Sequence, residues 1–248
     1  MMGADEVSLE QEGTMVRTVN LPILSELLGE IPIGRTLLML VDPDAQTTAL
    51  FVNAASGHLR AGGDLLYSSI NQPVSELRQL FVRGGLNIAE YEAKDSAVLF
   101  DAYSAAMGTK SPEKYHAFTS NLNEMSIAMA ESASLWPAGT LIVYESLSSM
   151  AFGQESVFSK FTRKVISIWR PRGTIVIAAM TTGLHPTSFY QDMKQISDAV
   201  VEVKLEEFRG EIVNTIRARS FRGRNADTRV RRVIFDDKMN ATTELLKR

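Results

Sequence analysis

The amino-acid sequence predicts an α/β fold with a mostly parallel central sheet, helices on both faces of the sheet, and an antiparallel C-terminal extension. Two observations lead to this prediction. Through most of the 248-residue chain, continuous apolar runs alternate with amphipathic helical segments. Such alternation indicates parallel strands, because each crossover between them needs a helix. Near the end, three strand-like segments follow one another across short turns, which is typical of antiparallel strands.

The composition is that of one globular domain. A chain of 248 residues can form a single large α/β domain. We expect residues 1–17, which lack periodicity, to be a flexible tail, and residues 18–248 to be one domain. The net charge of −3 does not favour polyanion binding by the molecule as a whole.

Several classes of protein are disfavoured. The chain has no cysteine, which excludes disulfides, thiolate metal sites and a cysteine nucleophile, and which fits a reducing compartment. The N-terminus has no apolar h-region of a signal peptide, and no apolar run reaches the roughly 18–20 residues of a membrane span. We therefore expect a cytoplasmic protein without membrane association.

The first elements follow from local patterns. A short helix is expected over residues 19–28, and residues 29–34 end it with two glycines and a proline. Residues 36–41 form a continuous apolar run, which indicates a strand covered on both faces. Further strands are expected at residues 64–70, 97–103, 140–145 and 174–179, and helices at 45–60, 73–83, 115–135, 155–169 and 189–196.

The last elements belong to the extension. Strands are expected at residues 199–205, 211–220 and 229–235, with turns at Gly210 and at Arg222-Gly-Arg224. In open parallel sheets, ligands bind beyond the carboxyl ends of the strands. The sequence places those ends at residues 41–44, 70–72, 103–104, 145–147 and 179–182.

The turn after the first buried strand lies where phosphate-binding loops lie, between a strand and a helix that opens on hydroxyl residues. Such a loop needs glycines to approach the phosphates, a lysine to neutralise them, and a hydroxyl group for Mg²⁺. Thr47 and Thr48 keep the hydroxyl. Gln46 stands where the lysine is needed, and Ala45 stands for the glycine before it.

Two carboxylates make this turn less suited to a polyphosphate. Asp42 and Asp44 would repel a phosphate at ~4 Å by about 1 kcal/mol in water and about 4 kcal/mol at an effective dielectric of 20. A structural turn in which Asp44 is the N-cap of the following helix explains the same residues. We therefore expect a structural turn.

Four segments carry a resemblance to a known family. They are Leu21-Pro-Ile-Leu-Ser-Glu-Leu-Leu-Gly-Glu-Ile-Pro-Ile-Gly-Arg-Thr36, Leu65-Leu-Tyr-Ser-Ser-Ile-Asn-Gln-Pro-Val-Ser-Glu-Leu77, Leu141-Ile-Val-Tyr-Glu-Ser-Leu-Ser148 and Ser220-Phe-Arg-Gly223. In this order they resemble the KaiC-like branch of the RecA superfamily of ATPases, over about residues 19–237. The resemblance implies a RecA-like P-loop NTPase fold. It also implies that the turn before Thr48 is a degenerate Walker A motif.

The resemblance makes three further positions informative. Asn71 and Gln72 stand where the family has a pair of glutamates, and an amide cannot serve as the general base; both could instead cap the next helix. Glu145 replaces the Walker B aspartate and keeps its charge. Ser220 replaces the lysine of a turn that reaches the neighbouring subunit's nucleotide in family hexamers, whereas Arg222 keeps its arginine.

A cluster of arginines marks the C-terminal region. Its members are Arg217, Arg219, Arg222, Arg224, Arg229, Arg231 and Arg232. The cluster could be a solvated face, a subunit interface that pairs with acidic groups such as Glu202 or Asp44, or a nucleic-acid interface. Few aromatic residues interleave with it, which disfavours single-strand binding.

The histidines do not predict a metal site. His58, His116 and His185 are far apart and lack metal-ligand spacing. His185 lies in the loop after the fifth strand, where a polar loop and a small-ligand site both remain open.

The sequence thus predicts a catalytically inactive RecA/KaiC-like domain, a pseudo-ATPase without catalytic residues or cofactor. Its role would be regulatory or scaffolding, in signal transduction, through association with a second copy or with a KaiC-like relative. One alternative is weak, slow ATPase activity with ATP and Mg²⁺ bound through Thr47, Thr48 and Glu145. The other is nucleic-acid binding by the arginine-rich hairpin.

Overall fold

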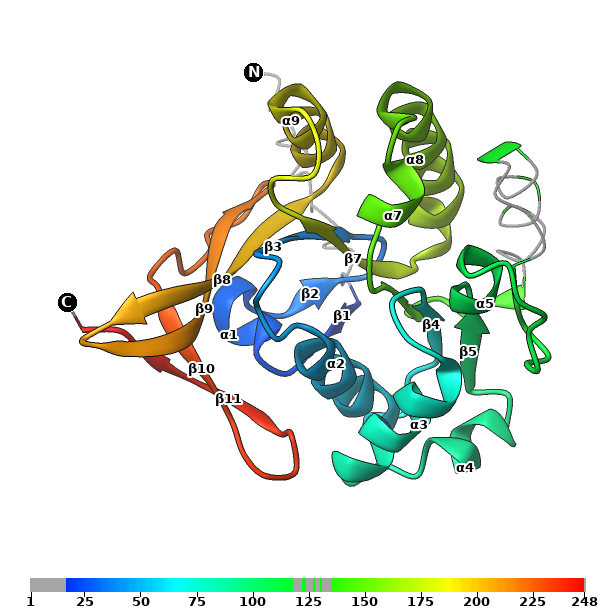
Figure 1. Cartoon of the computed structure of the whole chain (residues 1–248), viewed down its shortest axis with the longest axis horizontal. Coiled ribbons are helices and arrows are strands. Elements are labelled where there is room, and N and C mark those ends of the chain that lie inside the picture. Colours follow the sequence, from blue (N-terminus) through cyan, green and yellow to red (C-terminus); the bar gives the residue numbers. More distant parts are fainter. Residues whose placement is uncertain (1–16, 118–121, 124–126, 128–129, 131–134, 248) are drawn as a thin grey trace, which may run out of the picture.

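The computed structural model describes residues 17–117, 122–123, 127, 130 and 135–247. In this part of the chain, one sheet of nine strands has the order β11-β10-β9-β8-β3-β7-β6-β4-β5. The six strands from β8 to β5 pair in parallel, and β8 to β11 pair antiparallel. Both features of the predicted fold class, the parallel body and the antiparallel extension, are confirmed (Figure 1).

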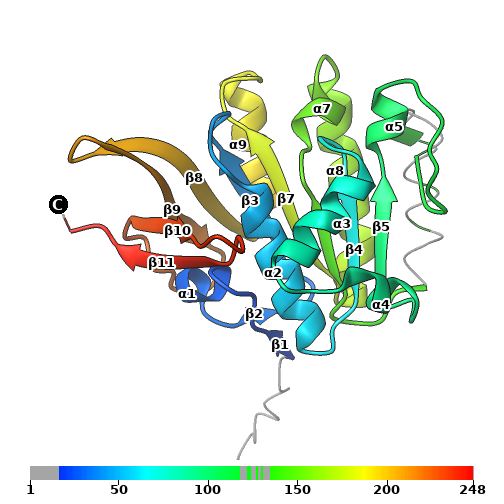
Figure 2. The ribbon, with the colours of Figure 1, turned by 60° about the horizontal axis from the view of Figure 1, so that its bottom comes forward.

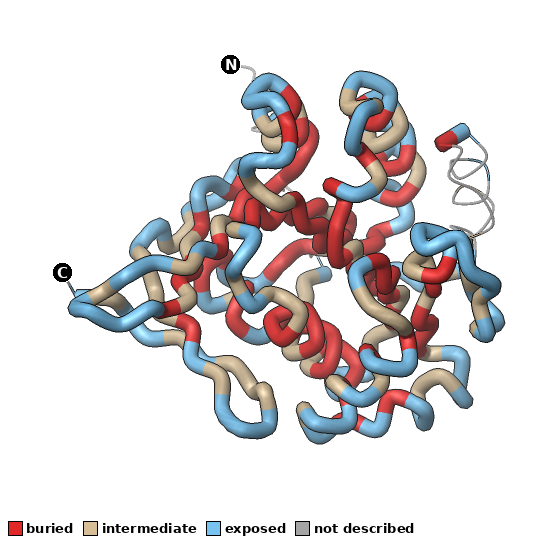
Figure 3. Tube along the Cα trace, in the orientation of Figure 1, coloured by how far each residue is buried: buried red, intermediate tan, exposed pale blue. Residues whose placement is uncertain are grey.

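The parallel body is centred on strand β3. Its strands are β3 (Thr36–Val41), β4 (Leu65–Ser69), β5 (Ala97–Asp101), β6 (Leu141–Tyr144), β7 (Ile175–Thr181) and β8 (Ala199–Phe208). Leu37 of β3 pairs with Ile177 of β7 on one side and with Ala199 of β8 on the other. All six residues of β3 are buried, as its unbroken apolar run predicts (Figure 3).

Helices cover both faces of this sheet (Figure 2). The helices are α1 (Leu24–Leu28), α2 (Thr48–Arg60), α3 (Val74–Arg83), α4 (Ile88–Glu92), α5 (Tyr103–Ala106), α7 (Ser148–Ala151), α8 (Glu155–Trp169) and α9 (Thr187–Ile196), with a short 3-10 helix at Arg170–Arg172. Side chains alternate between the faces of a strand. Leu37 and Met39 therefore belong to the core that α2 and α3 complete, and Leu38 and Leu40 to the core under α8 and α9.

Three strands form the antiparallel extension, namely β9 (Glu211–Phe221), β10 (Arg231–Phe235) and β11 (Ala241–Leu245). The hairpin of β10 and β11 reaches back to the body. Asn53 on α2 donates to the carbonyl of Met239 (2.7 Å) and accepts from the backbone N–H of Ala241 (3.0 Å). The extension is therefore part of the same packed unit as α2.

Several element boundaries differ from the sequence-based prediction. The helix expected from residue 45 begins at Thr48, because the preceding residues form a hydrogen-bonded turn. The strand expected to reach residue 103 ends at Asp101, whose carboxylate accepts the N–H of Ser104 and opens α5. The helix expected over residues 19–28 is confined to α1.

Other segments were not predicted at all. Two short strands, β1 (Thr18–Val19) and β2 (Ile31–Pro32), form a separate antiparallel pair. The helix α4 and the polar strand β11 were also missed. Most of the helix expected over residues 115–135 lies outside the described residues. At its beginning His116 instead forms a β-bridge with Asp101.

Among the residues that the structure describes, no helix combines the length and the apolar character that spanning a bilayer requires.

Candidate functional site

The candidate site lies at the carboxyl ends of β3, β4 and β6, where Glu145 connects three elements. Its Oε1 atom accepts hydrogen bonds from the hydroxyl of Thr48 (3.1 Å), the side-chain amide of Gln72 (3.2 Å) and the hydroxyl of Tyr67 (3.4 Å). Thr48 opens α2, Tyr67 lies in β4, and Gln72 lies in the turn after β4. Thr48, Gln72 and Glu145 are far apart in the sequence, and all three were predicted as site residues; the structure places them together. Tyr67 is a further member of the site that was not predicted.

Glu145 is buried, with 3% of its surface exposed. Burial raises the pKa of its carboxyl group, and the hydrogen bond from Thr48 is the strongest of the contacts that oppose this shift. The Oε2 atom is buried and has no hydrogen bond of normal geometry among the described residues. Burial and the nearby Glu145 also raise the pKa of Tyr67, which keeps its phenol protonated as a donor.

The turn after β3 directs its backbone N–H groups to acceptors of the protein. The N–H of Asp44 donates to the Asp42 carboxylate (3.2 Å), and the N–H of Ala45 donates to the Asp42 carbonyl (3.0 Å). The N–H of Gln46 donates to the side-chain oxygen of Asn214 in β9 (3.1 Å). Phosphate-binding loops point such N–H groups at the ligand. Here three consecutive groups already have partners.

The prediction that Asp44 caps α2 is wrong. The N-cap is Thr47, and its side chain makes no capping hydrogen bond. Asp42 instead closes a local turn by accepting the N–H two residues later, a common use of aspartate. Sequence reasoning also missed Asn214, because a polar residue in a strand carries no local signal of a contact with a distant turn.

The turn after β4 has a different role from helix capping. The N-cap of α3 is Pro73, so neither Asn71 nor Gln72 caps that helix. Asn71 is exposed, whereas Gln72 points its amide at Glu145 and accepts a hydrogen bond from Ser69 at its backbone carbonyl (2.6 Å). Gln72 is thus a donor within the carboxylate cluster.

The arginines of the C-terminal cluster do not form one free cationic surface. Their partners within the chain are Glu202 for Arg217 (2.7 Å) and Arg219 (3.5 Å), the carbonyls of Gln195 and Ser197 for Arg222, the carbonyl of Glu30 for Arg224, Asp227 for Arg229 and Arg231, and Glu211 for Arg232. Ser220 is exposed near the end of β9. Much of the positive charge is therefore neutralised inside this chain.

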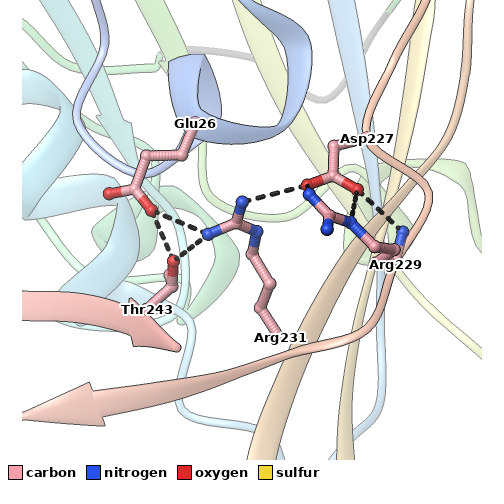
Figure 4. Close-up of polar contacts among 5 residues, drawn as sticks. All are labelled: Glu26, Asp227, Arg229, Arg231 and Thr243. Carbon is pink, nitrogen blue, oxygen red and sulfur yellow. Dashed lines mark hydrogen bonds and ion pairs between the residues drawn. The ribbon is translucent and has the colours of Figure 1, made fainter. Parts of the chain in front are cut away.

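Arg231 has an architectural position. Its guanidinium lies between Asp227 (2.9 Å) and Glu26 on α1 (3.4 Å), and it also donates to Thr243 of β11 (Figure 4). Only 16% of its side chain is exposed. Arg229 and then Arg231 hold the pKa of Asp227 well below its usual range. The contacts of Arg231 therefore connect α1 to the antiparallel extension.

The three histidines lie in separate places. The His185 ring contacts Glu155 (3.0 Å) and the rings of Phe152 and Phe189, and it is buried. Burial lowers the pKa of His58. Within the described ranges, no group of three histidine, aspartate or glutamate side chains is arranged to hold a metal ion.

Comparison with known proteins identifies the fold. The sequence matches no protein-family model and no curated protein. Among solved structures, the chain is similar to a KaiC-like protein from the hyperthermophilic archaeon Pyrococcus horikoshii OT3. The TM-score is 0.73 and the sequence identity 17%, over 92% of this chain and 99% of that chain. At this identity the likeness shows the fold alone. The chain therefore has a KaiC-like, RecA-type fold.

Proposed function

We propose that this chain is a catalytically inactive KaiC-like domain, a pseudo-ATPase that acts in regulation or scaffolding by associating with other protein chains. The observation that carries the proposal is the closed turn after β3. Asp42 and Asn214 accept the N–H groups of Asp44, Ala45 and Gln46. A polyphosphate would have to displace these acceptors and approach two aspartates without a lysine to compensate them.

The second support comes from the carboxylate cluster. In an active site of this kind, a carboxylate and a hydroxyl would hold Mg²⁺, and a glutamate would accept a proton from the attacking water. Thr48 and Glu145 are suitable ligands for the metal ion. The side-chain amide of Gln72, however, donates a hydrogen bond to the same carboxylate oxygen of Glu145, and an amide cannot act as the general base. The residues present therefore do not fit an ATP–Mg²⁺ group.

One contact favours the alternative of weak ATP binding. The hydroxyl of Thr48 lies 3.1 Å from Glu145, so the two groups that would share a metal ion are adjacent. No comparable observation favours nucleic-acid binding, since the arginines of the cluster have partners within the chain.

A thermal-shift titration with Mg-ATP separates the pseudo-ATPase from the weak ATPase. Ligand binding stabilises by RT ln(1+[L]/Kd), about 2.7 kcal/mol at a hundredfold excess over Kd. We expect no saturable rise in melting temperature beyond that produced by Mg²⁺ alone. A saturable rise that is lost in Thr48→Val and kept in Thr47→Val would refute the proposal and establish the weak site. Thr47→Val is the matched control because, of the two threonines, Thr48 is the one whose hydroxyl donates to Glu145.

We further propose that residues 18–248 are one domain and that the protein works in the cytoplasm. The nine-stranded sheet, which runs through both the body and the extension, and the hydrogen bonds between α2 and the extension support the first point. The absence of cysteine is consistent with the second.

A further inference from the structure

An apolar cavity lies between the sheet and the helices α8 and α9, which cover the same face of the sheet (Figure 2). It offers about 50 Å³ to the centres of water-sized atoms. One such atom needs about 10–15 Å³, so the space holds roughly three to five non-hydrogen atoms. Its apolar lining includes Leu38, Phe158, Val165, Trp169, Val176 and Ala178. Because apolar cavities exclude water and accept apolar molecules, this space suits a short aliphatic group.

The polar end of the cavity adjoins the carboxylate of Asp198, whose side chain is 1% exposed. Thr36 and Arg170 line the cavity, and both donate to Oδ2 of Asp198. The backbone N–H of Thr36 lies 3.0 Å from this oxygen and the Arg170 guanidinium 2.7 Å. Arg35 (3.2 Å) and Arg222 (3.8 Å) pair with Oδ1 of the same carboxylate. The cavity therefore ends beside three guanidinium groups.

These arginines carry more positive charge than their surroundings neutralise. Asp198 supplies one negative charge against three positive ones, a surplus of two. The C-terminal ends of α8 and α9 also lie here, because Arg170 is the C-cap of α8 and Arg222 donates to carbonyls at the end of α9. Each helix end contributes about −0.5 charge, which leaves a surplus of about one positive charge.

The surplus charge is within reach of a ligand from solvent. The side chains of Arg35 and Arg170 are 34% and 41% exposed. Within the part of the chain that the structure describes, the hydrogen bond of the Arg170 guanidinium goes to Asp198, and this leaves further N–H donors on the same planar group. A guanidinium matches the geometry of a carboxylate, so a small anion with one carboxylate fits this end of the cavity.

We propose that the cavity binds a short-chain aliphatic carboxylate, with its tail between α8 and the sheet and its carboxylate beside Arg170. The volume restricts the tail to about three or four carbons. An anion without a tail would leave the apolar space unfilled, and a neutral analogue would leave the surplus charge uncompensated. The arginines lie at the amino ends of the strands, whereas Glu145 lies at the carboxyl ends. This ligand site therefore goes beyond the proposed function and does not depend on it.

A thermal-shift titration of the full chain at constant ionic strength tests the ligand class, with isobutyrate as the probe. We expect a saturable rise in melting temperature of about 3–6 °C at a tenfold excess over Kd. Isobutyramide has the same shape without the charge, and inorganic phosphate has charge without a tail, so both should give clearly smaller rises. The absence of a saturable rise with isobutyrate, or an equal rise with either comparison compound, overturns the inference.

Variants of two arginines locate the carboxylate. Arg170→Gln removes the charge that lines the cavity, and we expect it to weaken isobutyrate binding by about tenfold or more. Arg172→Gln is the matched control, because Arg172 is a nearby exposed arginine outside the lining. Each shift is measured against the same variant without ligand, so a change in stability alone does not affect the result. Wild-type affinity of Arg170→Gln would contradict the proposed site.

Variants of two alanines in β7 locate the tail. Ala178→Val adds two methyl groups to the cavity and should also weaken isobutyrate binding. Ala179→Val adds the same groups on the opposite face of the strand and should bind like the wild type. Unchanged binding by Ala178→Val would show that isobutyrate binds elsewhere, which overturns the inference. If either alanine variant fails to fold, the arginine pair decides.

Discussion

At the scale of single residues, Glu145 determines what the candidate site can do. Three donors share its Oε1 atom, and its buried Oε2 atom has no hydrogen bond of normal geometry among the described residues. The sequence predicted this position, because Glu145 ends an expected strand that resembles the Walker B strand of the KaiC-like family. Its contacts with Tyr67 and Gln72 were not predicted, because they depend on how β4 and β6 pair.

The charge of Glu145 should make stability depend on pH. Its raised pKa in the folded state means that the unfolded chain releases the proton first as pH rises. Stability should therefore fall as pH rises from the ordinary glutamate pKa through the raised value. The neutral variant Glu145→Gln lacks this loss, so its stability relative to the wild type should increase between pH 5 and pH 8 in urea denaturation. The exposed Glu207→Gln controls for removal of a carboxylate; equal pH dependence of wild type and Glu145→Gln would contradict the expectation.

Gly57 shows a second residue-scale constraint. It lies inside α2, where alanine would ordinarily stabilise by about 1 kcal/mol. A Cβ atom at this position would lie 2.4 Å from Cγ and 2.5 Å from Cδ of Pro22, a rigid ring. We expect Gly57→Ala to destabilise by up to about 2 kcal/mol net, since overpacking costs about 1–3 kcal/mol and the helix propensity of alanine offsets about 1 kcal/mol. Gly84→Ala is the control, with its nearest contacts at an ordinary 3.5 Å; a Gly57→Ala melting temperature at or above the wild type would show that Pro22 can move.

At the scale of elements, α1 is held by residues from the other end of the chain. The carbonyl of Leu27 accepts the N–H of Asp227 (2.7 Å), and Arg231 bridges Glu26 and Asp227 (Figure 4). The ordinary reading of an arginine-rich hairpin is a binding surface. In this fold, Arg231 instead joins two elements that the sequence separates by about the length of the domain.

Removal of Arg231 should therefore reduce stability. Arg231→Ala leaves Asp227 and Glu26 without their shared partner, and we expect a loss of about 1–3 kcal/mol in urea denaturation, as for hydrogen bonds to charged groups. Arg229 is the control because it contacts the same Asp227. It contributes most to lowering the pKa of Asp227, but its side chain is 66% exposed and solvent screens the pair. Arg229→Ala should thus cost clearly less, and a loss equal to that of Arg231→Ala would contradict the argument.

The predictability of each element follows from what determines it. Strand β3 and helix α8 were predicted with their exact bounds, because an unbroken apolar run and an amphipathic stripe specify them locally. The start of α2 was predicted three residues too early, because Asn214 and Asp42 fix the turn before it. Strand β11 was missed because its polar sequence pairs only when β10 offers an edge.

At the scale of the whole molecule, the body and the extension share one sheet and one core. Val233 of β10 and Phe221 of β9 pack in the same apolar cluster as Leu37 of β3 and Leu59 of α2. Strand β8 belongs to both parts, since it pairs with β3 in parallel and with β9 antiparallel. An extension that folded separately would need its own hydrophobic core. These contacts show instead that the extension shares a core with the body.

The molecule should therefore unfold as one unit. In native-state hydrogen exchange with increasing urea, we expect the slowest amides of β3 and β10 to converge on the same opening free energy. The carboxyl-terminal edge strand β11 serves as an internal comparison for local fraying. Opening of β10 at a clearly lower free energy than β3 would show that the extension is an independent domain.

The central place of β3 has a consequence for synthesis of the protein in the cell. Ile177, a pairing partner of Leu37, follows it by 140 residues. At about 5–20 residues per second, the ribosome needs roughly 7–28 s to supply that partner. During this time the apolar segment from Leu37 to Val41 cannot be buried between its two neighbouring strands. Slower translation lengthens this exposure, so the yield of folded protein should depend on chaperones that shield the nascent chain.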